Sequence, residues 1–399
     1  MKKHSIVLMF AILTLLFTSC AAFKADAKIN SAVETIAPNS AEAQPMSVPI
    51  VEDEPRVVRF SATGDNLIHD GIYLQAAERA DGNGYDFAPL YANVADFYKQ
   101  FDVNWINQET LVTDELPPSS YPTFCTPTAL AIAAHNIGFN VFAMSNNHSY
   151  DKGALGIAAT RRFWETMPDD VVTTGFFEGD ADYDNIPMHE VNGVKIAYLA
   201  YTQYTNGIPT PKDATAHIIL TSDEMLIERQ VRLAQELADF VVVGVHWGNE
   251  GSHAVTEAQR ALAQKIADFG ADAIIGTHPH VIQPVEWITS ADQRKIPIAY
   301  SLGNFVSTQS AAPNMIGLVL NFDITENESG NFTAQNVAAT PTVTHYDAHY
   351  KNVREYLYKD YTDELAQKHG VHVNYPSFSR EYISDLLKTN ISSEFLNLN

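Results

Sequence analysis

The chain reads FVVVGVHWGNEGSHAVTEAQRALAQKIADFGADAIIGTHPH over residues 240–280. The apolar run that opens this stretch predicts a buried strand ending at His246. Thr256 and Gln259 have the spacing of a capping box, which begins a helix. A second apolar run, 273–276, predicts the next strand. A strand, a helix and a strand in this order are typical of an α/β fold.

The same alternation extends over most of the chain on both sides of this stretch. Further strands are expected at 57–63, 101–108, 141–145 and 195–201, the last of which follows a hairpin turn at Asn192-Gly193. Further helices are expected from Thr126 as the N-cap to Gly138, over 154–167, and from Thr221, paired with Glu224 in a capping box, to 238. After residue 321, two β-like runs and two helical stretches, 351–368 and 377–388, close the chain.

Polar residues that can carry chemistry follow directly after the expected strands. They are Asp65, Glu109, Asn147 with His148, His246 with Glu250, and His278 with His280. In open α/β sheets, ligands bind beyond the carboxyl ends of the strands, so these side chains should converge. Taken singly, Asp65 is equally consistent with a turn residue and His246 with a core histidine. Five strand ends together favour a common site.

This set of side chains has the chemistry of a metal centre. Carboxylates, an amide oxygen and imidazoles suit Mn, Zn or Fe better than Ca. A bridging carboxylate can hold two such cations, which activate water and clamp a transferring group. His148 is then left to give or take a proton, with Asp151 as its orienting partner. The sequence therefore predicts one or two divalent transition metals in a hydrolytic site.

The composition restricts the classes of partner. The 399 residues contain 25 Lys and Arg against 48 Asp and Glu, which gives a formal net charge of −23. This balance argues against nucleic acid as a partner. Two cysteines, Cys20 and Cys125, are too few for a disulfide framework or a cysteine-based zinc finger.

The N-terminus has the features of an export signal. Lys2 and Lys3 precede an apolar run over 6–17, which is too short to span a bilayer. The residues up to Cys20 resemble a bacterial lipobox, which implies a signal peptide over 1–19 and a lipidated cysteine. An ordinary signal peptide cut slightly later is the alternative. Residues 20–55 then form a flexible tether, and the protein is expected outside the cytoplasm, anchored to the membrane.

Several blocks together resemble a known family. They are Gly64-Asp65, Asn107-Gln108-Glu109, Ser145-Asn146-Asn147-His148 with Asp151, His246-Trp247-Gly248 with Glu250, His278-Pro279-His280 with Gln283, and Ser301-Leu302-Gly303-Asn304. In this order they resemble the CapA family, which is linked to poly-γ-glutamate capsule synthesis and is similar to calcineurin-like metallophosphoesterases. The resemblance implies a four-layer α/β/β/α sandwich over 56–345. The remaining residues, 346–399, are expected to form a C-terminal helical extension.

The resemblance also implies roles for single residues. Asp65 matches the first metal carboxylate and Glu109 the bridging one. Asn147 and His246 match ligands of the second metal, His148 and Asp151 the proton-handling pair, and His278 and His280 the closing pair of ligands. Residues expected to support these ligands or to contact substrate are His69, Asn107, Asn146, Glu250, Gln283, Ser301 and Asn304.

Two positions depart from the metallophosphoesterase pattern. Leu67 stands where that pattern has a histidine, and the nearest histidine, His69, is either a replacement ligand or a polar loop residue. Glu109 replaces the usual bridging aspartate. These departures bear on whether both metal positions are complete.

Three functions remain open from the sequence. The resemblance favours an exported lipoprotein of poly-γ-glutamate or related envelope-polymer synthesis and export, working with membrane synthases. A secreted metal-dependent hydrolase acting on a phosphoester or amide bond is the second. The third is a membrane-tethered binding or assembly protein without turnover.

Overall fold

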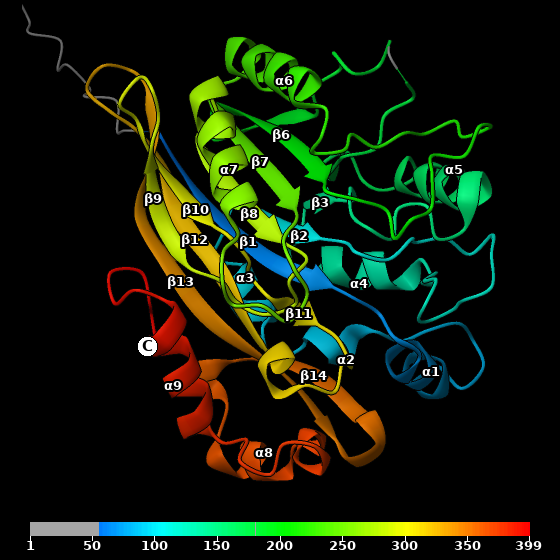
Figure 1. Ribbon diagram of the computed structural model, residues 1–399. Helices are drawn as coiled ribbons and strands as arrows, with labels where there is room; N and C mark the ends of the chain where they lie inside the picture. Colours follow the sequence, from blue (N-terminus) through cyan, green and yellow to red (C-terminus); the bar gives the residue numbers. More distant parts are fainter. Residues whose placement is uncertain (1–55, 180) are drawn as a thin grey trace, which may run out of the picture. The chain divides into compact units, whose positions relative to one another are not determined.

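The computed structural model describes residues 56–179 and 181–399 of the chain (Figure 1). The predicted signal peptide, the lipidated Cys20 and the tether all lie outside the described residues. Two β-sheets form the centre of the described part, and each has its own order of strands.

The larger sheet has eight strands within the described residues. They are β14 (Lys351–Leu357), β13 (Phe332–Asp347), β12 (Ile316–Glu326), β1 (Val57–Asn66), β2 (Val103–Asn107), β3 (Val141–Ala143) and β4 (Val172–Thr174) in spatial order, with β11 (Asn304–Val306) paired to β1. Strands β1 to β4 are parallel to one another, whereas β12, β13 and β14 form an antiparallel ribbon that pairs with β1.

The smaller sheet has six strands in the same part of the chain. They are β5 (Met188–Val191), β6 (Val194–Thr202), β7 (Phe240–His246), β8 (Ala273–Thr277), β10 (Lys295–Ala299) and β9 (Val285–Thr289) in spatial order. The centre of this sheet, from β6 to β10, is parallel, and the edge strands β5 and β9 are antiparallel to their neighbours.

The two sheets pack face to face, and the period-2 alternation of apolar residues shows how. In β6, Tyr198 points to the core between the sheets, whereas its neighbour Leu199 points to the opposite face under the helices. Trp105 of β2 lies against Tyr198, with ring centroids 6.1 Å apart. Gly244 of β7 makes room for that indole, since a Cβ there would lie 2.5 Å from it. The sheets thus form the two inner layers of a sandwich.

Helices cover both outer faces. They are α1 (Asp70–Arg79), α2 (Ala88–Tyr91), α3 (Ala95–Tyr98), α4 (Ala129–Asn136), α5 (Gly153–Trp164), α6 (Glu224–Leu237), α7 (Glu257–Phe269), α8 (Asp363–Lys368) and α9 (Arg380–Asn390). Helices α6 and α7 pack on the outer face of the six-stranded sheet (Figure 1), and α1 and α2 contact β14 of the other sheet. The predicted four-layer α/β/β/α sandwich is therefore confirmed.

Several local predictions are also confirmed. The Thr256–Gln259 capping box begins α7, and Gly270 ends it with a φ of 128°. The β5–β6 hairpin turns at Asn192 and Gly193, both of which have positive φ, as a tight hairpin requires.

Two predicted helix starts are wrong. Helix α4 has Thr128 as its N-cap, because Thr126 instead pairs with Val112 in an isolated β-bridge. Helix α6 has Asp223 as its N-cap, and its carboxylate accepts the N–H of Leu226.

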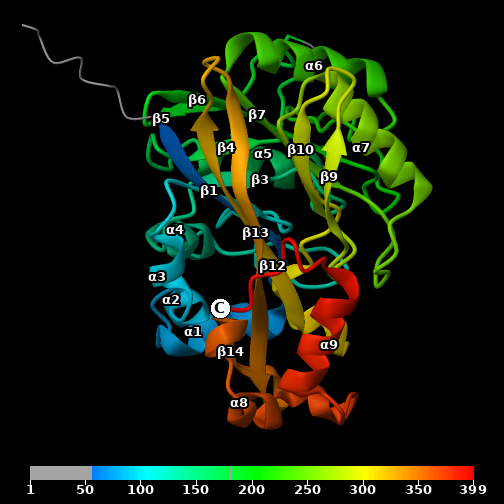
Figure 2. The same cartoon turned by 90° about the vertical axis from the view of Figure 1, so that its left-hand side faces the viewer.

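The stretch 351–368 was expected to be helical, but its first seven residues form strand β14. Alternate residues Val353, Glu355 and Leu357 are buried, which is the period-2 pattern of a strand lying on a core. The C-terminal segment then continues into α8 and α9, which lie at the lower end of the long β12–β13 ribbon in Figure 2. Within the described residues, no helix is both long enough and apolar enough to cross a membrane.

Candidate metal centre

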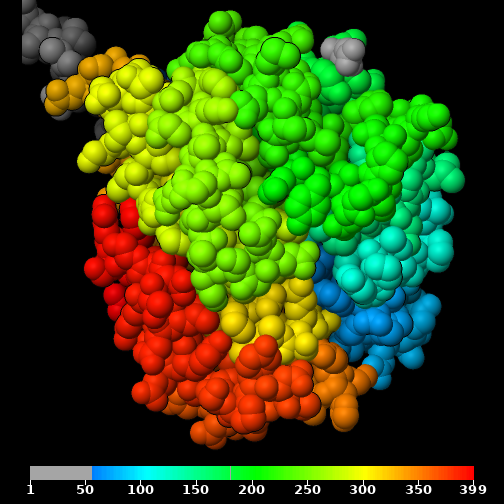
Figure 3. Space-filling view, viewed as in Figure 1, coloured from blue at the N-terminus to red at the C-terminus, as the bar shows by residue number. Residues whose placement is uncertain are grey.

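The centre forms where parallel strands of both sheets end. Asp65 lies at the end of β1, Glu109 just after β2, and Asn147 in the loop after β3. His246 is the last residue of β7, and His278 follows β8 directly. In the space-filling view, blue, yellow-green and yellow segments, far apart in the sequence, meet near the middle of the face (Figure 3). These side chains therefore lie together, as expected from the rule that ligands bind beyond the carboxyl ends of parallel strands, which is called the strand-end rule here.

One group of donor atoms consists of Asp65, Glu109 and His280, all of them buried. His280 Nδ1 lies 3.0 Å from Asp65 Oδ2 and 3.1 Å from Asn304 Oδ1, so Nδ1 carries a proton that these oxygens accept. His280 Nε2 is 3.7 Å from Glu109 Oε1. Asn107 Nδ2 donates to Asp65 Oδ1 at 2.8 Å and fixes the carboxylate plane.

A second group shares Glu109 and adds His246 and His278. His246 Nε2 lies 3.6 Å from Glu109 Oε1, 3.1 Å from His278 Nδ1 and 2.8 Å from Asn147 Oδ1. Ligands about 2.1 Å from one ion and at right angles to each other are roughly 3 Å apart. The three atoms around His246 Nε2 therefore lie at separations close to those between two ligands of one divalent cation.

The electrostatics of the centre fit cations. Glu109 is fully buried, and neither of its carboxylate oxygens has a hydrogen-bond partner among the described residues. Burial and the neighbouring Asp65 raise the pKa of Glu109 well above its usual range. Unpaired buried carboxylate oxygens are rare in native proteins, because each costs a full desolvation penalty. A bound cation would supply the partner that both carboxylate oxygens of Glu109 lack among the described residues.

Two of the three histidines, His246 and His278, are in the neutral state that metal ligands need. Burial lowers the pKa of His246 well below its usual range and that of His278 to about 4, so both are neutral at pH 7. Burial alone would also lower the pKa of His280, but Glu109 and Asp65 raise it to about 9. Its protonated ring then supplies part of the positive charge that a cation would bring. The residues present thus fit one or two divalent metals.

His148 and Asp151 form a hydrogen-bonded pair beside these groups. Asp151 Oδ2 lies 2.7 Å from His148 Nδ1 and also accepts the N–H of Phe124 at 2.6 Å. The ring of Phe124 meets that of His148 edge to face, with centroids 4.7 Å apart. The contacts hold the imidazole in one orientation with its proton on Nδ1, which leaves Nε2 as the position for a transferable proton.

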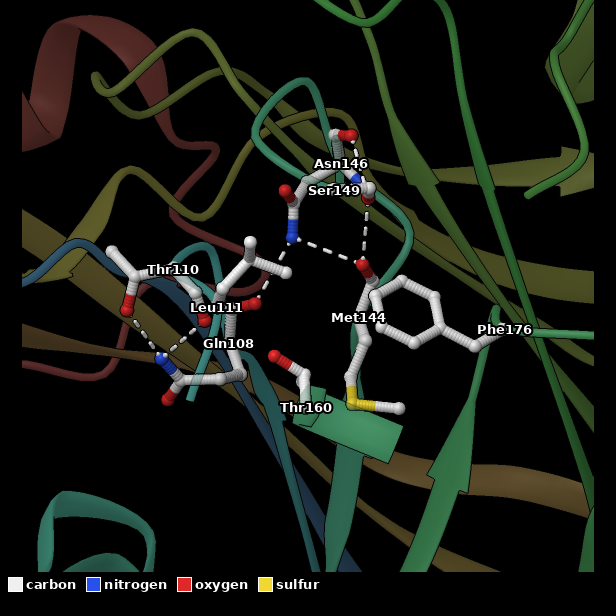
Figure 4. Close-up of a pocket in the computed structure, with 8 residues that line it drawn as sticks. All are labelled: Gln108, Thr110, Leu111, Met144, Asn146, Ser149, Thr160 and Phe176. Atoms are coloured by element: carbon white, nitrogen blue, oxygen red, sulfur yellow. Dashed lines mark hydrogen bonds between the residues drawn. The ribbon is translucent and has the colours of Figure 1, made fainter. Parts of the chain in front are cut away.

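The supporting residues expected from the sequence take different places. Asn146 does not face the donor groups: its Nδ2 donates to the carbonyls of Gln108 and Met144, as Figure 4 shows, and its Oδ1 accepts the N–H of His148. It therefore fixes the loop that carries Asn147 and His148. Beside it, Gln108 Nε2 donates to the hydroxyl of Thr110 at 2.9 Å (Figure 4).

Three more of these residues, Gln283, Ser301 and Asn304, lie around the loops that follow β8 and β10. Gln283 Nε2 donates to the carbonyls of Ser252 and Ala254, away from the donor groups. Ser301 Oγ donates to the carbonyl of Val281 and so joins the segment after β10 to the loop that carries His280. Asn304 contacts His280 directly.

The two departures from the expected pattern have structural consequences. Leu67 is buried, and its N–H donates to the carbonyl of Val306, so no ligand takes the missing position from there. His69 belongs to neither buried group: its Nδ1 lies 3.1 Å from the carbonyl oxygen of Leu67 and burial lowers its pKa to about 4. Glu250 is exposed and, with His278 and His280, makes a third set of nearby donor atoms at the rim.

Two residues that contact the centre were not in the predicted set. The hydroxyl of Tyr204 contacts Nε2 of His278, and Oδ1 of Asn206 accepts from Asn147 Nδ2 at 3.1 Å. Both follow β6, the neighbour of β7. The strand-end rule that predicted His246 applies equally to them, and Asn206-Gly207 is a turn pair that marks the end of this strand.

The sequence of this chain is similar to those of known proteins. A sequence profile of the bacterial capsule synthesis protein PGA_cap family matches residues 59–309. The PGA biosynthesis protein CapA of Bacillus subtilis (strain 168) is 32% identical over 53% of this chain and 55% of its own length. The capsule biosynthesis protein CapA of Bacillus anthracis is 37% identical over 44% of this chain and 42% of its own. The chain thus spans about half the length of these curated relatives.

Solved structures of low sequence identity also align with this chain. A novel phosphatase from Mycoplasma pneumoniae aligns with a TM-score of 0.46 and 12% identity, over 73% of this chain and 95% of the other. The profile match covers well over half of the chain and spans every donor residue of the centre. The chain belongs to the bacterial capsule synthesis protein PGA_cap family.

Proposed function

We propose that this chain is a metal-dependent hydrolase that acts on an envelope polymer or its precursor during capsule synthesis. The observation that carries the proposal is Glu109, a fully buried carboxylate with both oxygens unpartnered and donor groups on two sides of it. A structural carboxylate in a core would be hydrogen-bonded. A carboxylate that bridges two cations would have this arrangement. The donor atoms favour Mn, Zn or Fe as those cations.

The residues of the chain then have separate tasks. Bound divalent cations would supply positive charge for the scissile group and for an attacking water. Asp65, Glu109 and the three histidines of the donor groups would hold the cations, and Asn147 would add its amide oxygen. His148 gives or takes a proton at Nε2, while Asp151 keeps that ring in its tautomer and orientation.

The biological setting is proposed from the relatives and from the N-terminus. Two relatives are named for PGA or capsule biosynthesis, so the substrate we propose is poly-γ-glutamate or a phosphorylated or amide-linked envelope compound. The signal-like residues before Cys20 support an exported lipoprotein, anchored on the outer side of the cytoplasmic membrane and working with membrane synthases.

The test combines metal content with turnover. The full chain is purified without chelator, and Mn, Zn and Fe are measured by elemental analysis in the wild type and in Glu109→Ala and His278→Ala. We expect one to two metals per chain in the wild type and fewer in both variants. Turnover is then measured on nitrophenyl phosphate mono- and diesters, a γ-glutamyl anilide and poly-γ-glutamate. His148→Ala should lower turnover by about 10²–10⁴-fold and leave the metal content unchanged.

Two results would refute the proposal. A wild type that binds no metal, even with Mn or Zn added, would exclude the metal centre. A metal-loaded wild type that binds poly-γ-glutamate without cleaving any substrate, with affinity unchanged in His148→Ala, would instead establish a tethered binding protein.

A further inference from the structure

A short segment after β6 contacts the centre at several points. This segment, Gln203–Ile208, is called the strap here. Asn206 and Gly207 have left-handed φ values of 53° and 75°, which turn the chain back across the ends of the strands. Gln203 Oε1 accepts the N–H of Gly248 at 2.9 Å and so ties the strap to the loop after β7. The strap is therefore fixed relative to the donor groups.

Asn147 shows what the strap does for one ligand. An amide can bind a cation through its oxygen but not through its NH₂ group, so the side chain must be held in one of its two flip states. Asn147 Oδ1 faces His246 Nε2 at 2.8 Å, on the side of the donor group. Its Nδ2 donates to Asn206 Oδ1 at 3.1 Å on the other side. The acceptor on Asn206 favours the flip state in which the amide oxygen faces the cation.

His278 is held by the same segment. Its Nδ1 lies 3.1 Å from His246 Nε2 within the donor group, while its Nε2 contacts the hydroxyl of Tyr204. Tyr204 belongs to the strap, so the contact joins this ring to the segment that also contacts Asn147. A ring that binds a cation through Nδ1 carries its proton on Nε2, and the hydroxyl oxygen of Tyr204 is placed to accept that proton.

We infer that the strap sets the ligating atoms of the second donor group, with Asn206 selecting the oxygen of Asn147 and Tyr204 selecting Nδ1 of His278. Both are positioning residues, and the inference rests on the proposed metal centre. One exposed turn thereby fixes two ligands that come from different sheets.

The test is the affinity of the full chain for Mn²⁺ and for Zn²⁺, measured by competition with a chelating dye and independently of turnover. Asn206→Ala and Tyr204→Phe should each lower the affinity for one of the two bound ions by about 10-fold or more. This is the usual effect of removing a partner that orients a ligand. Asn206→Asp keeps an acceptor for Asn147 and should stay within about 3-fold of the wild type. Rescue by this variant is not expected from a role in folding alone.

Matched controls exist elsewhere in the chain. Asn336 has the same φ of 53°, is exposed and bonds only to Asp323 among the described residues, so Asn336→Ala carries the same backbone cost without touching the centre. Tyr358→Phe removes a hydroxyl that donates to the carbonyl of Arg380. Both controls should bind metal as the wild type does, and thermal melts in EDTA verify that every variant is folded.

The outcomes separate this inference from the proposed function. If the wild type binds two ions and both strap variants bind them equally well, the strap has no positioning role and the metal centre stands. If Asn206→Asp loses as much affinity as Asn206→Ala, the acceptor role is wrong. A wild type that binds no ion overturns both proposals at once.

Discussion

Replacing Glu109 by Gln should change the stability of the protein in opposite directions with and without metal. Without metal, the carboxylate of Glu109 is fully buried and both of its oxygens lack partners. An unsatisfied buried polar group costs about 1–3 kcal/mol, and more if charged. A neutral amide of the same size relieves part of that cost. Glu109→Gln should therefore be about 1–3 kcal/mol more stable than the wild type in EDTA.

With metal, the order should reverse. A ligand at 100 times its Kd stabilises the folded state by about 2.7 kcal/mol, and the wild type gains this for each ion it binds. Glu109→Gln removes the one carboxylate common to both donor groups, so the variant should gain little or nothing. For a chain of this size, 1 kcal/mol corresponds to about 2 °C in Tm. We expect the variant to melt some 2–6 °C above the wild type in EDTA and below it in saturating Mn²⁺.

The assay is a thermal melt of both proteins in EDTA and in increasing Mn²⁺ or Zn²⁺ at pH 7.5. Glu355→Gln is the matched control, because Glu355 is also fully buried, with Oε1 unpartnered, but lies in β14 away from the centre. It should keep the full metal-induced shift. The reasoning is refuted if Glu109→Gln is no more stable than the wild type in EDTA, or if metal stabilises the two proteins equally.

Further predictions concern the proton-handling pair, the close approach of two loops and the pH dependence of stability. Asp151→Asn should lower turnover at least ~10-fold with metal content unchanged, because the ring of His148 loses its charged partner; equal turnover would contradict this. Gly64→Ala places a Cβ 1.9 Å from a backbone carbonyl oxygen and should cost ~2 kcal/mol or more in urea unfolding, whereas Gly71→Ala, with 3.3 Å of space, should cost less than half of that. Burial raises the pKa of Glu355, so its contribution to folding is complete below the usual glutamate range and is lost as the pH rises. Glu355→Gln should hence add about 1–2 kcal/mol at pH 8 and almost nothing at pH 4, and a gain independent of pH would contradict this cause.

The centre was predictable because its ligands follow a rule of position. Each predicted donor stands at or just after the end of a strand, and apolar runs and helix caps locate those ends well in the sequence. The capping box at Thr256 and the turn at Gly270 fix the helix between β7 and β8, and so fix the register of His246 and His278. The sequence thus contains enough local information to bring these side chains together.

Other features depend on contacts between distant parts of the chain. Strand β14 carries the polar Glu355 at a buried position, which breaks the apolar pattern of a strand and favours a helical interpretation. It forms because β13 supplies a partner edge and α2 covers it. The start of α4 is similar, since Thr126 pairs with Val112 instead of capping the helix. Tertiary pairing overrides local propensity at both places.

The two proposed donor groups differ in the number of side chains that they contain. With Leu67 in place of a histidine, the first donor group keeps three residues, whereas the second, with Asn147, has four. Fewer ligands give weaker binding, so we expect the second group to hold its cation more tightly than the first. It is also the group that Tyr204 and Asn206 contact, and no residue of the strap bonds to Asp65 or His280 among the described contacts. The orienting contacts are therefore concentrated on the more complete of the two positions.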